Sequence, residues 1–230
     1  MIAAFDRFAI AFVGVPKCMS TSVLRSFYKL EHGTAFDRAA FGGNIHRFYR
    51  QRVADRITSV EPPDLAGLAG LAGLWIFTII RNPIRRLLSV YTNRVCDHRD
   101  IVKALEKAPD ATLDPMPTAD AFFRDLPRSR AQVPSIKHHT DNFAQFLGPD
   151  LTRYDAVFRV EDADTMQTAL SERLGQPFVL ENEQRSRASL TLDDLSAEAR
   201  ARIIAHTHPD FELLAPFYSL ETSLRSQLRA

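Results

Sequence analysis

Three apolar runs of strand length mark the chain, and residues with helical spacing follow each of them. The runs lie within residues 1–15, 75–80 and 154–160. Short apolar runs rich in β-branched and aromatic residues indicate strands that are buried on both faces. Apolar positions with helical spacing follow at 20–31, 82–95 and 164–174. Because strands alternate with helices, the pattern predicts an α/β fold with a central parallel sheet flanked by helices.

The segments between these elements carry weaker patterns. Residues 36–43 are predicted as a loop, and residues 65–74, a repeated Leu-Ala-Gly triplet, as a loop or weak helix. Residues 97–136 are rich in Pro and charge, and we interpret them as a lid or substrate-facing insertion within a single domain of residues 1–230. A plain surface excursion of the chain has the same composition. Further helices are predicted at 45–57, 101–107, 118–126, 139–147, 195–205 and 211–217.

The end of the first run has the layout of an anion-binding strand, loop and helix. The apolar residues stop at Pro16 and Lys17, and a hydroxyl cluster at 20–22 opens the helical segment. The first amides of a helix lack intrahelical partners and lie at the positive end of the helix dipole. Since Lys17 adds a full charge, we expect a phosphate or sulfate group to bind here. An ordinary N-cap followed by a solvated helix has the same residues.

Spacing separates this loop from two familiar phosphate-binding loops. A Walker A loop places its lysine directly before a Ser or Thr, whereas Lys17 precedes the hydroxyl cluster by three residues. The loop of cysteine phosphatases needs an arginine six positions after its cysteine, but Leu24 stands six positions after Cys18. Neither loop explains the segment.

A second basic cluster follows the middle apolar run. Arg81 stands directly after that run, at the carboxyl end of the expected strand, where open α/β sheets place ligand contacts. Asn82 and Pro83 are typical of an N-cap and the first position of a helix. Arg86 and Ser89 are three residues apart and share a helix face, so we expect them to converge on one anion. An arginine-rich helix that only faces solvent has the same pattern.

Composition limits the classes of partner. Lys and Arg total 29 against 28 Asp and Glu, and a net charge of +1 predicts no binding to nucleic acid or to an anionic membrane. No apolar stretch is long enough for a membrane span, and no signal-peptide pattern is found. The two cysteines, Cys18 and Cys96, form neither a disulfide framework nor a zinc site. We therefore expect a reduced, cytoplasmic protein of undetermined oligomeric state.

The two basic segments together resemble a known family. Residues 16–22 (PKCMSTS) are similar to the P-K-x-G-[ST]-T-S loop of sulfotransferases that use 3′-phosphoadenosine 5′-phosphosulfate. Residues 81–91 (RNPIRRLLSVY) are similar to the R-x-P-x-x-R-x-x-S-x-Y segment of that family. The resemblance is closest to carbohydrate sulfotransferases of the Golgi and bacterial type, which also carry segments like residues 154–162 and 206–211. It implies a P-loop-like three-layer sandwich that sulfates a hydroxyl of a small-molecule or carbohydrate acceptor, or of a glycolipid.

The resemblance also implies roles for individual residues. The loop would hold the 5′-phosphosulfate, with Lys17 stabilising the transferred group as well, and the second segment would hold the 3′-phosphate. No metal is expected, because a sulfuryl group carries less negative charge than a γ-phosphoryl group. The residues assigned to the 5′-phosphosulfate are Lys17, Cys18, Ser20, Thr21 and Ser22, and those assigned to the 3′-phosphate are Arg81 and Ser89.

One residue departs from the family's loop pattern. Met19 stands where the family has glycine. If that position requires a positive φ or a close approach of the backbone, methionine is costly there. The Arg-Lys-Gly element with which soluble small-molecule sulfotransferases close over the cofactor is also missing, and residues 182–189 are the expected substitute.

The acceptor hydroxyl needs a general base, and histidine suits this role near neutral pH. His46 comes first, since related enzymes carry an acceptor-side histidine in this region. His138 and His139 follow. Glu161 and Asp162, after the third apolar run, are alternatives.

Two other functions share the anion loop. A nucleotide-dependent kinase would need an acidic Mg²⁺ ligand at a strand end, a place that Glu161 and Asp162 occupy. A binding module without turnover is the second alternative, and Met19 is the residue that suggests it.

Overall fold

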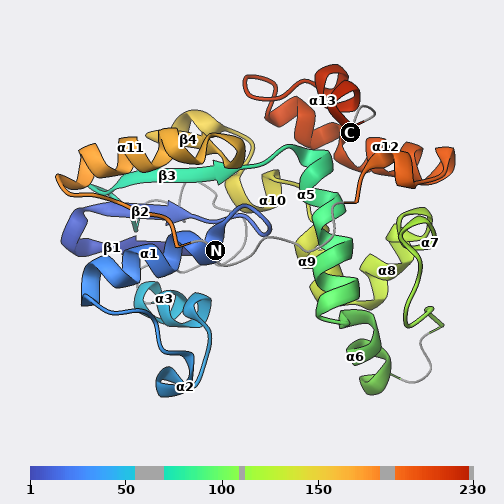
Figure 1. Ribbon diagram of the computed structural model, residues 1–230, viewed down its shortest axis with the longest axis horizontal. Helices are drawn as coiled ribbons and strands as arrows, with labels where there is room; N and C mark the ends of the chain where they lie inside the picture. The colour runs from blue at the N-terminus through green and yellow to red at the C-terminus, as the bar shows by residue number, and fades with distance from the viewer. Residues whose placement is uncertain (55–69, 109–111, 182–189, 228–230) are drawn as a thin grey trace. The chain divides into compact units, whose positions relative to one another are not determined.

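The computed structural model describes residues 1–54, 70–108, 112–181 and 190–227 (Figure 1). The chain forms two compact units, which we describe separately. The first comprises Met1–Arg81 and Phe143–Arg185, and the second comprises Asn82–Asn142 and Ser186–Ala230. That residues 1–230 act as a single domain with an inserted lid stays a prediction.

The first unit contains a four-stranded sheet with the order β1-β2-β3-β4. The strand β1 (Ile2–Phe5) pairs antiparallel with β2 (Ile10–Val13), whereas β3 (Trp75–Ile80) and β4 (Ala156–Arg159) continue in parallel. Helices flank this sheet (Figure 1). The predicted α/β class with helices flanking a central sheet is therefore confirmed, and the sheet is parallel as predicted except for β1, which pairs antiparallel.

The first apolar run makes two strands, so the expectation of one strand within residues 1–15 was wrong. The 3₁₀ helix η1 (Asp6–Phe8) reverses the chain, and the Ala9 amide donates to the Asp6 carbonyl at 3.1 Å. Ala9 has a φ of 52°. The charged pair Asp6 and Arg7 is exposed at this turn, whereas residues 3–5 before it and residues 10–13 after it are buried. Periodicity alone could not separate one long strand from a tight hairpin.

The two faces of the sheet bury different sets of side chains. On one face, Phe27 of the helix α1 (Ser20–His32) stacks on Phe5 with ring centroids 3.8 Å apart and also packs near Phe77. On the other face, Ala4 and Ala11 pack with Val53 of the helix α3 (Ile45–Val53) and with Leu71. The helix α11 (Ala163–Leu174) packs on β4.

Helix α1 begins and ends close to where its sequence predicts. Gly33 terminates it in the left-handed conformation, at a φ of 73°, and its amide donates to the Lys29 carbonyl at 2.8 Å. The segment 36–43, predicted as a loop, contains the short helix α2 (Arg38–Phe41). Asp37 caps α2 by accepting from the Ala39 and Ala40 amides. Residues 55–57 and 65–69 of other predicted elements lie outside the described part.

The strand β4 is half-buried rather than covered on both faces, because it is an edge of the sheet. Its start is tied to β3 by the Asp155 side chain, whose Oδ2 accepts from the Ile76 amide at 2.6 Å. The Tyr154 hydroxyl donates to the carbonyl of Leu147, the last residue of the helix α10 (Ala144–Leu147). The apolar run therefore predicted the strand correctly, but the side chains of the strand are more exposed than predicted.

The second unit is helical. Its core joins the helix α5 (Pro83–Val90) to residues of the segment 97–136 and of the C-terminal helices. Asn82 and Pro83 begin α5 as predicted, with the Arg85 amide donating to Asn82 Oδ1 at 3.2 Å. After α5 comes the π-helix η2 (Tyr91–Asp97). The other helices are α6 (Asp100–Lys107), α7 (Ala119–Arg124), α8 (Leu126–Gln132), α9 (Pro134–Thr140), α12 (Ala197–Leu213) and α13 (Leu220–Gln227).

Prolines account for most helix errors in this unit. A proline usually indicates a break in a helix, so neither α8 nor α9 was predicted. Pro127 and Pro134 lie in the first turns of these helices, where the missing N–H costs no intrahelical hydrogen bond. Pro209 lies inside α12, although two helices were predicted around it. The helix continues past Pro209 to Asp210 and Phe211, whose side chains are buried. A further predicted helix, 139–147, is interrupted at Asp141 between α9 and α10.

Arg86 is the most deeply buried basic side chain of α5, at 2% exposure. Its guanidinium lies 4.0 Å from the Asp210 carboxylate of α12, which is equally buried. It also donates to the carbonyls of Asp141 at 2.8 Å and His139 at 3.3 Å. Arg86 therefore joins α5, α9 and α12.

We expect Arg86→Met to lower the free energy of unfolding by about 3–5 kcal/mol, because it leaves the Asp210 carboxylate buried without its cation. Chemical denaturation measures the change. Arg85, its exposed neighbour on α5, gives the matched control, and Arg85→Met should change stability by no more than about 0.5 kcal/mol. Equal effects of the two substitutions would contradict this role of Arg86.

Candidate functional site

The loop between β2 and α1 has two residues in the left-handed region. Lys17 has a φ of 69° and Met19 a φ of 58°, while the Cys18 amide between them donates to the Val15 carbonyl at 3.3 Å. Alternation of right- and left-handed residues turns successive amides toward a common concave side, which is a general geometry for anion binding. The position where methionine replaces the family's glycine does adopt a positive φ.

Close packing at Gly14 brings the end of β2 against the start of α1. A Cβ at Gly14 would lie 2.9 Å from Phe12 Cε1 and 3.2 Å from Ser20 Oγ, so this position needs glycine. The Ser20 hydroxyl is buried and donates to the Val15 carbonyl at 2.7 Å. Ser20 therefore closes the loop with its side chain, and its amide is the group left to face an anion.

The first turn of α1 supplies amides that have no intrahelical partner. The Val23 amide makes the helix's first bond, to the Met19 carbonyl at 3.1 Å. The amides of Ser20, Thr21 and Ser22 precede that bond. Thr21 and Ser22 are half-buried, as is Lys17, whereas the Cys18 side chain is completely buried. The loop has the donors and the dipole that stabilise an anion.

Arg81 connects the second motif to this loop. It follows the last residue of β3, and since β2 and β3 are parallel their carboxyl ends lie at the same edge of the sheet. The Arg81 Nη1 donates to the Lys17 carbonyl at 3.3 Å. The structure therefore brings together Lys17 and Arg81, two basic residues 64 positions apart.

His46 contacts the loop through Thr21. Its Nε2 lies 2.9 Å from Thr21 Oγ1, and its Nδ1 lies 3.0 Å from the sulfur of Met1. Burial, followed by the positive charges of the Met1 amino group, Arg50 and Arg25, lowers the pKa of His46 to about 4. The imidazole is therefore neutral near pH 7.

Two predicted site residues, Ser89 and His139, belong to the second unit. The Ser89 hydroxyl donates to the Arg86 carbonyl at 2.6 Å. The Nδ1 of His139 lies 2.7 Å from the Ser135 carbonyl, and we assign it as the protonated nitrogen. The expectation that Arg86 and Ser89 converge on an anion is wrong for Arg86, which is buried against protein partners.

The remaining candidate bases have separate surroundings. Glu161 and Asp162 lie in the 3₁₀ helix η4 (Val160–Asp162) after β4, where Asp162 pairs with Arg159. His138 is exposed on α9. His206 donates from Nε2 to the Thr140 carbonyl at 2.7 Å, and burial lowers its pKa. Residues 182–189, expected to close over the cofactor, lie outside the described part.

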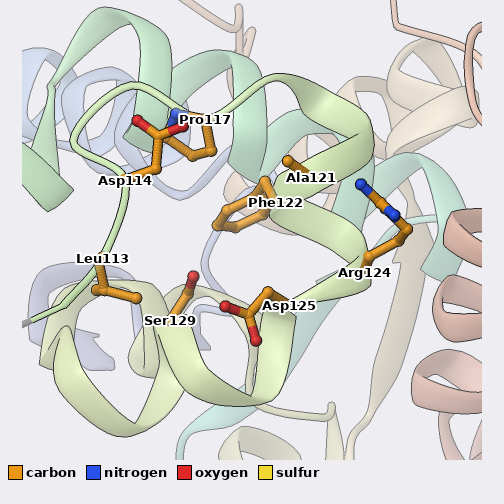
Figure 2. A pocket seen from close by; sticks show the side chains of 8 residues that line it. All are labelled: Leu113, Asp114, Pro117, Ala121, Phe122, Arg124, Asp125 and Ser129. Carbon is orange, nitrogen blue, oxygen red and sulfur yellow. The ribbon is translucent and has the colours of Figure 1, made fainter.

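The second unit has a cavity of about 320 Å³ around α7 and α8 (Figure 2). The side chains of Asp114, Arg124 and Asp125 place charges around it, and Phe122 and Pro117 add apolar surface. The cavity lies in the segment 97–136. Its lining combines apolar and charged side chains, and the assignment of this segment to the acceptor stays a prediction.

No group of three or more His, Cys, Asp or Glu side chains in the described ranges is arranged to hold a metal ion. Within the same ranges, no helix combines the length and the hydropathy that a membrane crossing requires.

Three further residues shape the site and were not selected from the sequence. Met1 contacts His46, Gly14 allows the close approach of Ser20, and the charge of Arg25 acts on His46. The four-residue spacing of Thr21 and Arg25 on one helix is the signal that would have identified Arg25. Nothing local in the sequence marks the contact between Met1 and His46.

We expect Met19→Gly to stabilise the protein by about 1 kcal/mol. It removes a left-handed penalty of roughly 1–2 kcal/mol and adds chain entropy worth roughly 0.5–1 kcal/mol to the unfolded state. Thermal unfolding measures the gain, and Met19→Leu, which keeps the Cβ, should show none. A lower midpoint for the glycine variant would mean that the Met19 side chain contributes more by packing than its backbone costs.

The comparisons with known proteins agree with this geometry. No curated protein and no solved structure matches the chain. A family model does match, over residues 2–218, and its description is the sulfotransferase family. The matched range includes the loop of Lys17 and Met19, Arg81 and the helix α5. The chain therefore belongs to the sulfotransferase family, the enzymes that transfer a sulfuryl group to an acceptor.

Proposed function

We propose that the protein transfers the sulfuryl group of 3′-phosphoadenosine 5′-phosphosulfate to a hydroxyl of a carbohydrate or glycolipid acceptor. The observation that carries the proposal is the hydrogen bond from Arg81 to the Lys17 carbonyl. It joins, within the first unit, the loop that resembles the family's phosphosulfate loop to Arg81, the first residue of the segment that resembles the family's 3′-phosphate segment.

The loop suits the phosphosulfate end of this donor. The amides of Ser20, Thr21 and Ser22, the hydroxyls of Thr21 and Ser22, and the Lys17 ammonium would hold it. The Ser20 hydroxyl donates to Val15, so Ser20 would contribute its amide. Arg81 would hold the 3′-phosphate with the rest of its guanidinium, because a single Nη1 bond leaves other N–H groups on the same fork.

Catalysis would depend on positioning and on charge. Lys17 and the amides of the loop would stabilise the negative charge that grows on the leaving phosphate oxygen. A base would take the proton of the acceptor hydroxyl. His139, in a stretch that resembles the histidine-containing region of related enzymes, is the proposed base. The donor, when bound, supplies the activated sulfuryl group.

The carbohydrate class of the acceptor is supported by the segment 154–162. This segment resembles the strand of Golgi-type and bacterial carbohydrate sulfotransferases, and it forms β4 with the adjoining helix η4. The carboxylates of Glu161 and Asp162 lie at the carboxyl end of this strand.

We expect 3′-phosphoadenosine 5′-phosphate to raise the thermal midpoint of the protein without added metal. A ligand at about 100 times its Kd stabilises by about 2.7 kcal/mol, which differential scanning fluorimetry resolves. Lys17→Ala and Arg81→Ala should each abolish the shift, since each removes a cation that pairs with a phosphate.

Lys29→Ala and Arg85→Ala are the matched controls, because both side chains are exposed, and they should keep the full shift. Transfer of radioactive sulfate from the labelled donor to a panel of glycans and glycolipids then tests the acceptor. Stabilisation by ATP and Mg²⁺ but not by the bisphosphate would overturn the proposed donor.

A further inference from the structure

The contacts of His46 leave neither of its ring nitrogens facing an acceptor. Nε2 is 2.9 Å from Thr21 Oγ1 and Nδ1 is 3.0 Å from Met1 Sδ. A general base must present a nitrogen lone pair to the proton it removes. In the geometry of this structure, both ring nitrogens point at groups of the protein.

The chemistry of the two partners assigns the tautomer of His46. A thioether sulfur carries no hydrogen and only accepts, so the nitrogen beside Met1, Nδ1, is the protonated one. The neutral ring then has its lone pair on Nε2, and the Thr21 hydroxyl donates to it. The hydrogen of Thr21 is therefore directed at His46, and its oxygen lone pairs are left for other groups.

In this arrangement the Thr21 hydroxyl does not donate to a bound anion, because its hydrogen is directed at His46. A phosphate or sulfate oxygen accepts hydrogen bonds, so Thr21 must turn its hydrogen toward the anion in order to bind it. Thr21 Oγ1 then needs a donor at the position of Nε2. A neutral ring protonated at Nε2 would donate there but would lose the hydrogen bond from Nδ1 to Met1 Sδ. An imidazolium keeps that bond and donates to Thr21 as well, because both of its nitrogens carry hydrogen.

We propose that His46 is a positioning residue of the anion loop, which takes up a proton from solvent when the donor binds and so switches the Thr21 hydroxyl from His46 to the anion. The inference rests on the proposed function, since it concerns the same loop. It replaces the expectation that His46 removes the proton of the acceptor.

The charges around His46 determine the direction of the effect. With burial, the positive charges of Arg50 of α3 and Arg25 of α1, and of the Met1 amino group when it is protonated, hold the pKa of His46 at about 4. Burial and Arg50 lower the pKa of the Met1 amino group itself to about 6, so it titrates at the acid end of this range in wild-type protein and in His46 variants alike. A bound anion beside Thr21 opposes those charges and raises the pKa. Binding therefore takes up protons, and affinity should rise as the pH falls toward neutrality and below.

Titration calorimetry with 3′-phosphoadenosine 5′-phosphate from pH 6 to pH 8 tests the proton uptake. As the pH falls, the affinity of the wild-type protein should increase more than that of His46→Gln. The difference between the two is at most about ten-fold per pH unit, because one proton is taken up. Both proteins bind the same ligand, so the difference between them removes the titration of its phosphates. His208→Gln, an exposed histidine of α12, should follow the wild-type curve.

Substitutions separate positioning from base catalysis. Glutamine places an amide at the position of Nε2, so His46→Gln should keep the affinity within about three-fold. His46→Ala should weaken binding by about five- to ten-fold. Because His46 acts through Thr21, the double variant His46→Ala with Thr21→Val should bind no more weakly than Thr21→Val alone. Thermal midpoints verify that each variant is folded.

Measurement of kcat provides the result that would contradict the inference. Loss of kcat by about 10²–10⁴ in His46→Gln, with unchanged affinity and the wild-type pH curve, would identify His46 as the base and overturn the inference. If the wild-type protein binds no bisphosphate at all, the proposed function fails, and the inference fails with it.

Discussion

The candidate site depends on one constraint, the turn from β2 into α1 through two left-handed residues. A backbone in this conformation persists only where its surroundings determine it. Here the Cys18 amide and the Ser20 hydroxyl both bond to the Val15 carbonyl, and Arg81 holds the Lys17 carbonyl. This turn leads directly into α1, which begins at Ser20.

Much of the fold could be predicted from local signals. The strand 75–80, the helix that begins at Ser20 and the cap formed by Asn82 and Pro83 all appear where the pattern places them, since short-range preferences determine them. The errors concern features that depend on distant partners. A turn at Asp6 divides the first run because β1 pairs with β2, and α12 continues through Pro209 because it packs into a core.

The site was predictable as a loop, but the directions of its side chains were not. A run of Ser, Thr and Ser suggests three equivalent hydroxyls, whereas the structure gives them different partners. The Ser20 hydroxyl bonds to the loop itself, and the Thr21 hydroxyl pairs with a histidine 25 positions away. Such contacts depend on how α3 packs beside α1, which no short motif contains.

The two arginines of the motif in residues 81–91, Arg81 and Arg86, have different surroundings and therefore different roles. Arg81 stands at a sheet edge beside the anion loop, whereas Arg86 lies inside a helical core and pairs with Asp210. A motif that includes both arginines gives them equal weight as evidence for a ligand. Of the two, only Arg81 lies beside the loop that is proposed to bind one. A sequence that keeps the second arginine and lacks the first would be recognised by its architecture, and its chemistry would have to be established independently.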